Sequence, residues 1–403
     1  MKYTQEEVLE YVREEDVRFI RLTFCDVFGI QKNIAITPRE LPRAFSDGIS
    51  FDASAISGFG DEAHSDLLLH PDPDTLMPLP WRPEHGRVMQ MLSTVTRSDG
   101  TPFPCDTRTL LKKAVADARK DGCDFTFGAE QEFYLFRLDE DGKPTKLPID
   151  DAAYMDIAPD DRGENVRREI CLTLEQMGIC PESSHHEEGP GQNEIDLRYA
   201  DALTAADEAM TFRRTVRTIA HRNGLAADFS PKPLGNAPGN GFHINMSLRS
   251  LDDPAVFSSM IAGILKYAGE MTLFLNPCDD SYRRLGSFKA PKFVSWSREN
   301  RSQLVRLPAA SGEYRRAELR SPDPMANPYL AFTLMIYAGL SGIQSRLPLP
   351  APSNLNLYSA PPEVLAGYEK LPENYPAACK KAAASEFIRS CIPSEILDIY
   401  CRK

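Results

Sequence analysis

The sequence lacks the features that mark the commonest membrane, secreted and nucleotide-binding proteins. Its 403 residues contain no apolar run of 18 residues, so we predict no membrane span. The first residues contain no positively charged segment followed by an apolar run, so we predict no secretory signal. No GxxxxGK[ST] loop, no kinase-type glycine-rich loop and no GxGxxG after a strand occurs, which removes support for the common nucleotide-binding folds. We expect a cytoplasmic protein.

Paired cysteines and positive charge are also scarce. The nine cysteines are an odd number at irregular spacing, with no pair at zinc-finger spacing, which predicts reduced thiols rather than a disulfide framework. Lysine and arginine total 46 against 58 acidic residues, so the formal net charge is -12. This charge disfavours nucleic acid as a partner, and no basic cluster interleaved with aromatic residues offsets it.

The most informative segment that is present is FGAEQEFYLF at residues 127–136, which places Glu130 and Glu132 two positions apart in a strand-like run. Alternation along a strand points both carboxylates to one face, roughly 7 Å apart, while Phe127 and Phe133 point to the other face. Two like charges on a partly buried face need a counter-ion, and a bound cation is the usual solution. A solvated strand face is the alternative, because charged residues are mostly exposed.

Three further strand-like runs repeat this spacing of polar residues, and a predicted loop adds one more carboxylate. We expect the runs to present their polar side chains to one shared concave surface. Convergent ionisable groups favour a functional cleft over a solvated face. The positions are Glu194 and Asp196 in GPGQNEIDLRY, His243, Asn245 and Ser247 in GNGFHINMSL, Arg316, Glu318 and Arg320 in YRRAELRSP, and Glu187 in the predicted loop HHEEG at 185–189.

The residue types in this predicted cleft indicate its chemistry. Five glutamates with a single histidine form an oxygen-rich set that suits Mg²⁺ or Mn²⁺ better than zinc. Arginines carry fork-shaped donors that match phosphate and carboxylate oxygens, so a divalent site lined by them suggests phosphoryl transfer. Each arginine could instead form an ordinary surface ion pair. The arginines concerned are Arg284, Arg301, Arg306, Arg316 and Arg320.

These motifs resemble those of the glutamine synthetases, in their short bacterial type I form, and the resemblance covers nearly the whole chain. GAEQEF resembles the family's paired metal-ligand strand and HHEEGPGQNEID its second metal segment. PKPLGNAPGNGFHINMSL resembles the glutamate and nucleotide segment, and ENRSQLVRLP with YRRAELRSPDPMANPYLAF the arginine-rich phosphate segment. The resemblance implies an α+β fold, with a small β-grasp domain over residues 1–100. A catalytic domain over residues 104–403 would hold a curved antiparallel sheet backed by helices.

The resemblance also assigns roles to individual residues. Two or more Mg²⁺ or Mn²⁺ ions are implied, one held by Glu132, Glu187 and Glu194 and another by Glu130, His243 and Glu318. Glutamate would contact Arg284, Arg320 and the loop at Gly239, and ATP would contact Asn245, Ser247, Arg306 and Arg316, with Arg301 facing the phosphates as a catalytic residue.

The acceptor side of the implied site is shared between subunits. Asp52 in FDASAISGFG matches the aspartate that a neighbouring subunit contributes to the ammonium pocket, and Tyr154 resembles the tyrosine of that pocket. The implied assembly is a homododecamer of two hexameric rings. Tyr358 in NLY resembles a tyrosine that some relatives modify with AMP, and the sequence leaves open whether it is modified here.

The implied reaction forms glutamine from glutamate and ammonia in two steps. The γ-carboxylate of glutamate attacks the terminal phosphoryl group of ATP to give γ-glutamyl phosphate, and ammonia then displaces phosphate. Carboxylates first attract ammonium and then take its proton.

The sequence departs from the family pattern on this acceptor side. The family's flap ends in a glutamate just before Ala-Pro, whereas this chain reads GSFKAPKF and has Lys289 there. After Asp52 the family reads Gly-Ser-Ser, whereas this chain has Ala53, Ser54 and Ala55. Pro238 replaces the asparagine that precedes Gly239 in the family. A protonated lysine would repel ammonium or occupy its place, unless it swings into solvent. Two alternatives to glutamine synthesis follow: a γ-glutamyl ligase for another amine, and a catalytically weak relative that binds ATP or glutamate as a regulatory protein.

Helical and strand patterns complete the predictions. The segments whose pattern predicts helices are TQEEVLEYVREED, DTRTLLKKAVADARKDG and TAADEAMTFRRTVRTIAHRNG. Those whose pattern predicts strands are VRFIRLTFCDVFG and QKNIAIT. We expect SEFIRSCIPSEILDIYCRK at 385–403 to form one helix. In the family such a tail inserts into the opposing ring, although a helix packed on its own domain would show the same pattern.

Overall fold

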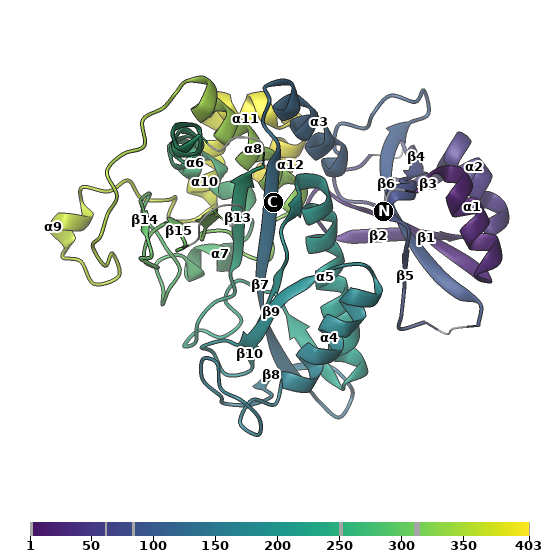
Figure 1. Cartoon of the computed structure of the whole chain (residues 1–403), viewed down its shortest axis with the longest axis horizontal. Helices are drawn as coiled ribbons and strands as arrows, with labels where there is room; N and C mark the ends of the chain where they lie inside the picture. Colours follow the sequence, from purple (N-terminus) through teal and green to yellow (C-terminus); the bar gives the residue numbers. More distant parts are fainter. Residues whose placement is uncertain (1–2, 61–62, 83–84, 250–252, 310–314, 403) are drawn as a thin grey trace.

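Two β-sheets organise the chain, and each has its own set of helices (Figure 1). The structure is a computed structural model that describes residues 3–60, 63–82, 85–249, 253–309 and 315–402. The N-terminal unit lies at one end of the molecule, and the long strand β7 (Phe125–Leu138) runs through the larger unit (Figure 1). This is the α+β arrangement that the sequence predicts.

The N-terminal sheet has the strand order β2-β1-β6-β4-β3, with β5 paired to β6. Its central strands β1 and β6 run parallel. Helix α1 (Gln5–Glu14) begins at Thr4, whose side chain and that of Glu7 form a reciprocal capping box and satisfy two free backbone N–H groups. The strands are β1 (Val17–Cys25), β2 (Gln31–Ile36), β3 (Ile49–Asp52), β4 (Asp66–Pro71), β5 (Met77–Pro78) and β6 (Arg87–Arg97), with helix α2 (Leu41–Ser46) and the 3₁₀ turns η1 (Pro38–Glu40) and η2 (Pro73–Thr75) between them.

The larger sheet has ten strands, ordered β14-β15-β16-β13-β7-β10-β9, and β8, β11 and β12 also pair with β7. Strand β7 is therefore the axis around which this sheet forms. Its partners are β8 (Pro144–Pro148), β9 (Pro181–His186), β10 (Gln192–Leu197), β11 (Ala200–Asp201), β12 (Leu225–Asp228), β13 (Phe242–Leu248), β14 (Trp296–Arg298), β15 (Val305–Leu307) and β16 (Ala317–Leu319).

Helices cover the apolar face of this sheet and bury the core. Phe127 of β7 stacks on Phe332 of α8 with ring centroids 4.3 Å apart, so the face opposite Glu130 and Glu132 is the core face, as the alternation predicts. The helices are α3 (Thr107–Lys120), α4 (Glu164–Gln176), α5 (Ala202–Arg222), α6 (Pro254–Leu275), α7 (Asp279–Arg284), α8 (Pro328–Gln344), α9 (Pro362–Leu365) and α10 (Tyr375–Ala384). The three helices that the sequence predicts before the C-terminal segment are confirmed as α1, α3 and α5.

The C-terminal segment forms two helices, so the prediction of a single helix is wrong. Helix α11 (Glu386–Cys391) ends before Pro393 and α12 (Ser394–Arg402) begins after it, because proline lacks a backbone N–H and disfavours helical geometry in the preceding residue. Tyr400 of α12 is buried, and its hydroxyl donates to the carbonyl oxygen of Val27 at 3.0 Å. The tail therefore packs on its own chain and joins the two units.

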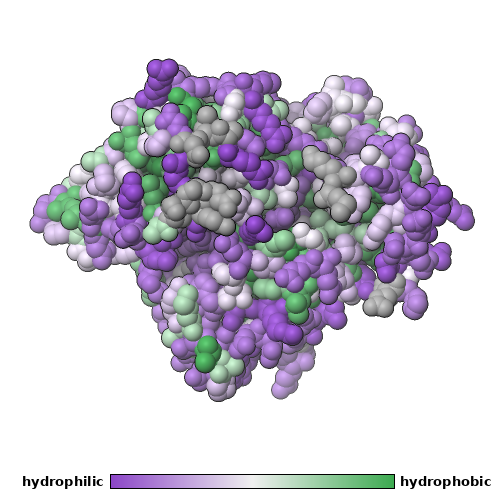
Figure 2. Space-filling view, in the orientation of Figure 1, coloured by the Kyte–Doolittle hydropathy of each residue, from purple (hydrophilic) through white to green (hydrophobic). Residues whose placement is uncertain are grey.

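The surface is mainly hydrophilic on the face shown in Figure 2, where hydrophobic side chains gather in small groups. Within the described part of the chain, each helix is too short or too polar to span a bilayer.

Glu208 on α5 is a largely buried carboxyl group whose pKa affects the stability of the fold. Burial, assisted by the charges of Asp207 and Asp201, raises the pKa of Glu208 to about 8. The folded state therefore keeps a proton that the unfolded chain releases near the ordinary glutamate pKa of 4.5, so this group lowers stability as pH rises between those values. Glu208→Gln should raise the melting temperature by a few degrees at about pH 8 and much less at about pH 5, measured by calorimetry. Equal shifts at both pH values, or a similar pattern in the exposed control Glu140→Gln, would contradict this cause.

Candidate active site

The register of β7 with its neighbours sets the polar residues opposite one another. Glu132 lies opposite Glu194 of β10, and Glu130 lies opposite Asp196 of β10 and His243 of β13. Residues directly opposite in an antiparallel pair share a face. The predicted shared polar surface is thus built on three adjacent strands.

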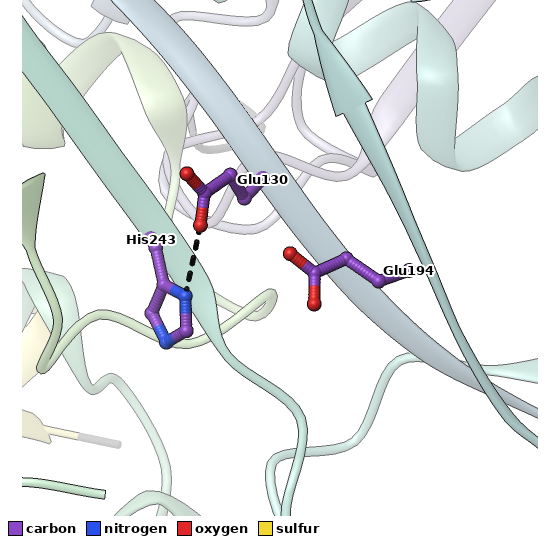
Figure 3. Close-up of side chains that lie close together, drawn as sticks. All are labelled: Glu130, Glu194 and His243. Atoms are coloured by element: carbon purple, nitrogen blue, oxygen red, sulfur yellow. Dashed lines mark hydrogen bonds and ion pairs between the residues drawn. The ribbon is translucent and has the colours of Figure 1, made fainter. Parts of the chain in front are cut away.

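Ligand atoms from this surface gather in two groups that share Glu194. One atom each from Glu130, Glu194 and His243 lie within 4.8 Å of one another, and so do atoms from His185, Glu187 and Glu194. Figure 3 shows the carboxylates of Glu130 and Glu194 and the ring of His243 extending into one space from three strands. His243 Nδ1 is 3.2 Å from Glu130 Oε2, the contact dashed in Figure 3. Two neighbouring groups of this kind could hold two cations.

The charges on the two flanks of β7 are unequal. Burial would raise the pKa of Glu130, but hydrogen bonds from His243 and Asn245 and the charges of His243 and Arg306 outweigh it and lower the pKa to about 2. Glu194 Oε2 lies 3.7 Å from His185 Nε2, but burial and then the charge of Glu132 still raise the pKa of Glu194 well above the ordinary range. Burial and the charge of Glu130 likewise raise the pKa of Asp196 to about 6. Negative charge is therefore poorly compensated on the β10 side.

Two donors that the sequence did not single out hold Glu132 in place. Its Oε2 accepts hydrogen bonds from Gln192 Nε2 at 3.0 Å and from the backbone N–H of Gly241 at 2.8 Å. Gln192 stands two positions before Glu194 in a strand, and that spacing was the signal that could have found it. These fixed donors leave Oε1 of Glu132 directed to His243 Nε2 at 3.9 Å.

Arginines surround Glu318 of β16. Its Oε2 accepts from Arg306 Nε and its Oε1 from Arg320 Nε at 3.2 Å, while His243 Nδ1 is 3.6 Å from Oε1. Strand β16 spans only residues 317–319, so Arg316 and Arg320 flank it rather than lying within a longer strand as predicted. Arg320 Nη1 also donates to the carbonyl oxygen of Arg301.

Arg284 presents an unsatisfied donor beside the glycine-rich loop. It is 2% exposed, its Nη1 donates to the Ser321 carbonyl oxygen at 2.8 Å, and its buried Nε has no partner among the described residues. A Cβ at Gly239 would approach the Arg284 side chain to 2.9 Å and the Pro231 carbonyl oxygen to 2.3 Å. Only glycine fits this close approach, which leaves the cavity floor open at Arg284.

A cavity of about 480 Å³ joins these groups. Of the residues predicted for the site, it is lined by Glu130, Glu132, Tyr154, Glu187, Glu194, Gly239, His243, Arg284, Lys289, Arg301, Arg306 and Arg320. Glu318 lies behind this wall, fully buried. Asn245, Ser247 and Arg316 line a second cavity of about 140 Å³, which shares Glu130, Ser183 and Asp196 with the first.

Asp52 lies apart from this cavity. It ends β3 in the N-terminal sheet, is exposed, and accepts hydrogen bonds from the Ser54 backbone and hydroxyl at 2.9 and 2.6 Å. It is not among the described residues that line the cavity. Within one chain the structure therefore does not bring Asp52 to the other predicted site residues, and its place in a site shared between subunits stays a prediction.

The predicted loop 185–189 is partly wrong, because His185 and His186 complete strand β9 and pair with Glu194 and Asn193. Behind them lies a buried network that the sequence did not indicate. His186 contacts the Glu187 carbonyl oxygen through Nδ1 at 2.6 Å and Asp150 Oδ1 through Nε2 at 3.0 Å. This network fixes the backbone from which Glu187 projects.

The fold and site define an α+β protein whose cavity combines carboxylates suited to cations with arginines suited to anionic substrates. The sequence profile described as "Glutamine synthetase, catalytic domain" matches residues 104–403, and that described as "Glutamine synthetase, beta-Grasp domain" matches residues 16–98. The chain belongs to the glutamine synthetase family.

Individual relatives agree with this assignment. A glutamine synthetase from Clostridium saccharobutylicum is 42% identical over 414 residues, covering 99% of this chain and 94% of the relative. One from Methanosarcina mazei is 42% identical over 416 residues, covering 99% and 93%. A solved structure described as a GmaS/ADP complex has a TM-score of 0.88 and 29% identity, covering 98% of this chain and 94% of that one. The predicted family and fold class are confirmed.

Glu194, common to both ligand groups, gives a direct test of cation binding. Glu194→Gln removes a poorly compensated negative charge, so the variant should melt at a higher temperature than the parent when divalent ions are chelated. It should also lose roughly half or more of the increase in melting temperature that Mg²⁺ or Mn²⁺ gives the parent. Thermal denaturation with and without each ion measures both effects. The exposed control Glu363→Gln should match the parent, and a full metal response in Glu194→Gln would contradict the assignment.

Proposed function

We propose that this chain is an ATP-dependent ligase that forms glutamine from glutamate and ammonia through γ-glutamyl phosphate. The curated relatives support ATP-dependent glutamine formation. The observation that carries the proposal for this chain is the single cavity in which the carboxylate groups of β7 and β10 face the side chains of Arg284, Arg301 and Arg306. Such a cavity can hold cations, an amino acid carboxylate and phosphates together.

The donor set supports Mg²⁺ or Mn²⁺ as the cations. Its oxygen donors and one histidine suit these ions. Burial, and then the charges of neighbouring carboxylates, raise the pKa values of Glu194 and Asp196, and a bound cation would relieve that repulsion. When bound, the ions would supply charge neutralisation at the transferred phosphoryl group. We propose that two or more ions bind, one held by Glu132, Glu187 and Glu194 and one by Glu130, His243 and Glu318.

In the first step, the arginines orient the two anionic substrates. We assign Arg284 and Arg320, with the backbone at Gly239, to glutamate, because the buried Nε of Arg284 beside this loop has no partner in the part of the chain that the structure describes. The γ-carboxylate oxygen attacks the terminal phosphorus of ATP, the bond to the bridging oxygen breaks, and ADP leaves. The residues assigned to ATP are Asn245, Ser247, Arg306 and Arg316, with Arg301 stabilising the transferred group.

In the second step, the acceptor side must bind a cation and then remove its proton. Tyr154 and Glu187 line this end of the cavity, and we propose that Asp52 of a neighbouring subunit completes it. A carboxylate takes one proton from ammonium, and ammonia attacks the γ-carbonyl carbon. The bond from that carbon to the phosphate oxygen then breaks, and the departing phosphate takes the second proton, which the new amide nitrogen loses. In this proposal, a complete site would need at least one subunit interface.

The other predicted functions are not favoured. The curated relatives named above are glutamine synthetases, which gives no preference to another acceptor amine or to a non-catalytic binding protein. We extend the proposal to a homododecamer of two hexameric rings and to two domains, residues 1–100 and 104–403. The cytoplasmic location remains a prediction from the sequence.

Phosphate release by the purified chain tests the proposal directly. With ATP, glutamate and Mg²⁺ or Mn²⁺, we expect phosphate release that depends on ammonium and matches the glutamine formed. Release with another amine but not ammonium would reassign the acceptor. If no phosphate were released with any amine, the proposed ligase activity would be contradicted, even if ligands still raised the melting temperature.

Arg284→Lys tests the assignment of the glutamate subsite. Lysine keeps the charge but loses the planar fork, so the KM for glutamate should rise about tenfold or more, with a smaller change in the KM for ATP. Arg283→Gln is the matched control, because Arg283 is the preceding residue of α7 but is exposed and paired with Asp280. Steady-state kinetics on both variants distinguishes them, and equal changes in both would exclude a specific role for Arg284.

A further inference from the structure

Lys289, the residue that departs from the family pattern, has a specific partner in the structure. Its Nζ forms an ion pair with Glu188 Oε1, although the two residues are 101 positions apart. The same Nζ lies 5.9 Å from the centre of the Tyr154 ring, within the range of a cation–π contact. All three residues line the cavity. The lysine ammonium group thus lies between a carboxylate and an aromatic face at the acceptor end.

The backbone at Lys289 is held independently of this ion pair. Its carbonyl oxygen accepts from the Tyr358 hydroxyl and from Arg320 Nη1 at 3.4 Å. The preceding residue, Phe288, has a φ of 51°, and its ring lies 4.3 Å from Lys232 Nζ. Because these contacts fix the loop, the position of the Lys289 ammonium group depends on which carboxylate its side chain meets.

Two carboxylates compete for that ammonium group. Glu187 and Glu188 are adjacent and both line the cavity, while Glu187 Oε2 already accepts from the Glu188 backbone at 2.9 Å. Without the Glu188 carboxylate, Lys289 would meet the neighbouring Glu187, which we assign to a cation and which lines the acceptor end of the cavity with Tyr154. A second cation there would oppose binding of ammonium by direct repulsion and by competition.

We propose that Glu188 determines acceptor specificity as a positioning residue: it holds the ammonium group of Lys289 and so leaves the position beside Glu187 and Tyr154 to the acceptor cation. This inference rests on the proposed function and deepens it. The pair carries no net charge, so the flap lysine does not exclude ammonium as it would alone. The Lys289 side chain is 57% exposed, and such pairs contribute little to folding, so the effect should be on binding and not on stability.

The test compares a charged with an uncharged acceptor in Glu188→Gln. The KM for ammonium should rise about tenfold, because Lys289 is no longer neutralised. Hydroxylamine is uncharged at neutral pH, so its KM should change by less than about twofold, as should the KM values for glutamate and ATP. Removing both charges in Glu188→Gln/Lys289→Gln should return the KM for ammonium to within about threefold of the parent. Melting temperatures should stay close to that of the parent.

A matched control removes a carboxylate from a similar pair elsewhere. Glu369 pairs with Lys381 Nζ at 2.6 Å and is 56% exposed, and it does not line the cavity among the described residues. Glu369→Gln makes the same change in net charge and should leave every KM unchanged.

Three results would overturn the inference: an unchanged KM for ammonium in Glu188→Gln, an equal rise for hydroxylamine, or a double variant as impaired as Glu188→Gln. Failure of the proposed function looks different, because the parent itself would then release no phosphate with either acceptor. That result would overturn the inference together with the function on which it rests.

Discussion

The repulsion between carboxylates that the sheet register forces together is the constraint around which this structure is built. Strand pairing places Glu132 opposite Glu194 and Glu130 opposite Asp196, and like charges directly opposite in a sheet are destabilising. Burial of the apolar face of the same strand stabilises the fold and offsets the free-energy cost of this repulsion. Phe127, Phe133 and the residues around them are fully buried against helices, so the core can carry a surface that would not be stable alone.

Compensation by polar partners is uneven, and this unevenness gives the cavity its chemistry. On the β13 and β16 side, His243, Asn245 and the arginines at Glu318 neutralise charge and hold the pKa of Glu130 near 2. On the β10 side burial, and then the charges of neighbouring acids, raise the pKa values of Glu194 and Asp196. The side chains of Glu130, Glu194 and His243, drawn in Figure 3, line the cavity where these two sides meet. A divalent cation there would relieve the repulsion, so cation binding and stability are linked.

The sequence was sufficient for features that depend on one segment at a time. Alternation in β7 predicted the shared face of Glu130 and Glu132 and the opposite core face, and the helical patterns of three segments predicted α1, α3 and α5. Features that depend on pairing between distant segments could not be derived in this way. Three such features depend on which strands meet. They are the register that places Glu132 opposite Glu194, the hydrogen bonds that Gln192 and Gly241 donate to Glu132, and the continuation of β9 through His186. The proline that splits the C-terminal helix was visible in the sequence, but the apolar spacing on both sides of it favoured a single helix.

Lys289 shows why a residue's charge cannot be interpreted without its partner. As an isolated substitution in the flap, lysine reverses the charge expected where a cation must bind, and this suggests another acceptor. In the structure its ammonium group meets Glu188, and the pair is neutral as a unit. The sequence contained both residues, but Glu188 and Lys289 are 101 positions apart and no spacing pattern connects them. The electrostatic property that the acceptor meets therefore belongs to the pair, and a lysine in the flap is compatible with an ammonium site because a second carboxylate is supplied from the β9–β10 connection.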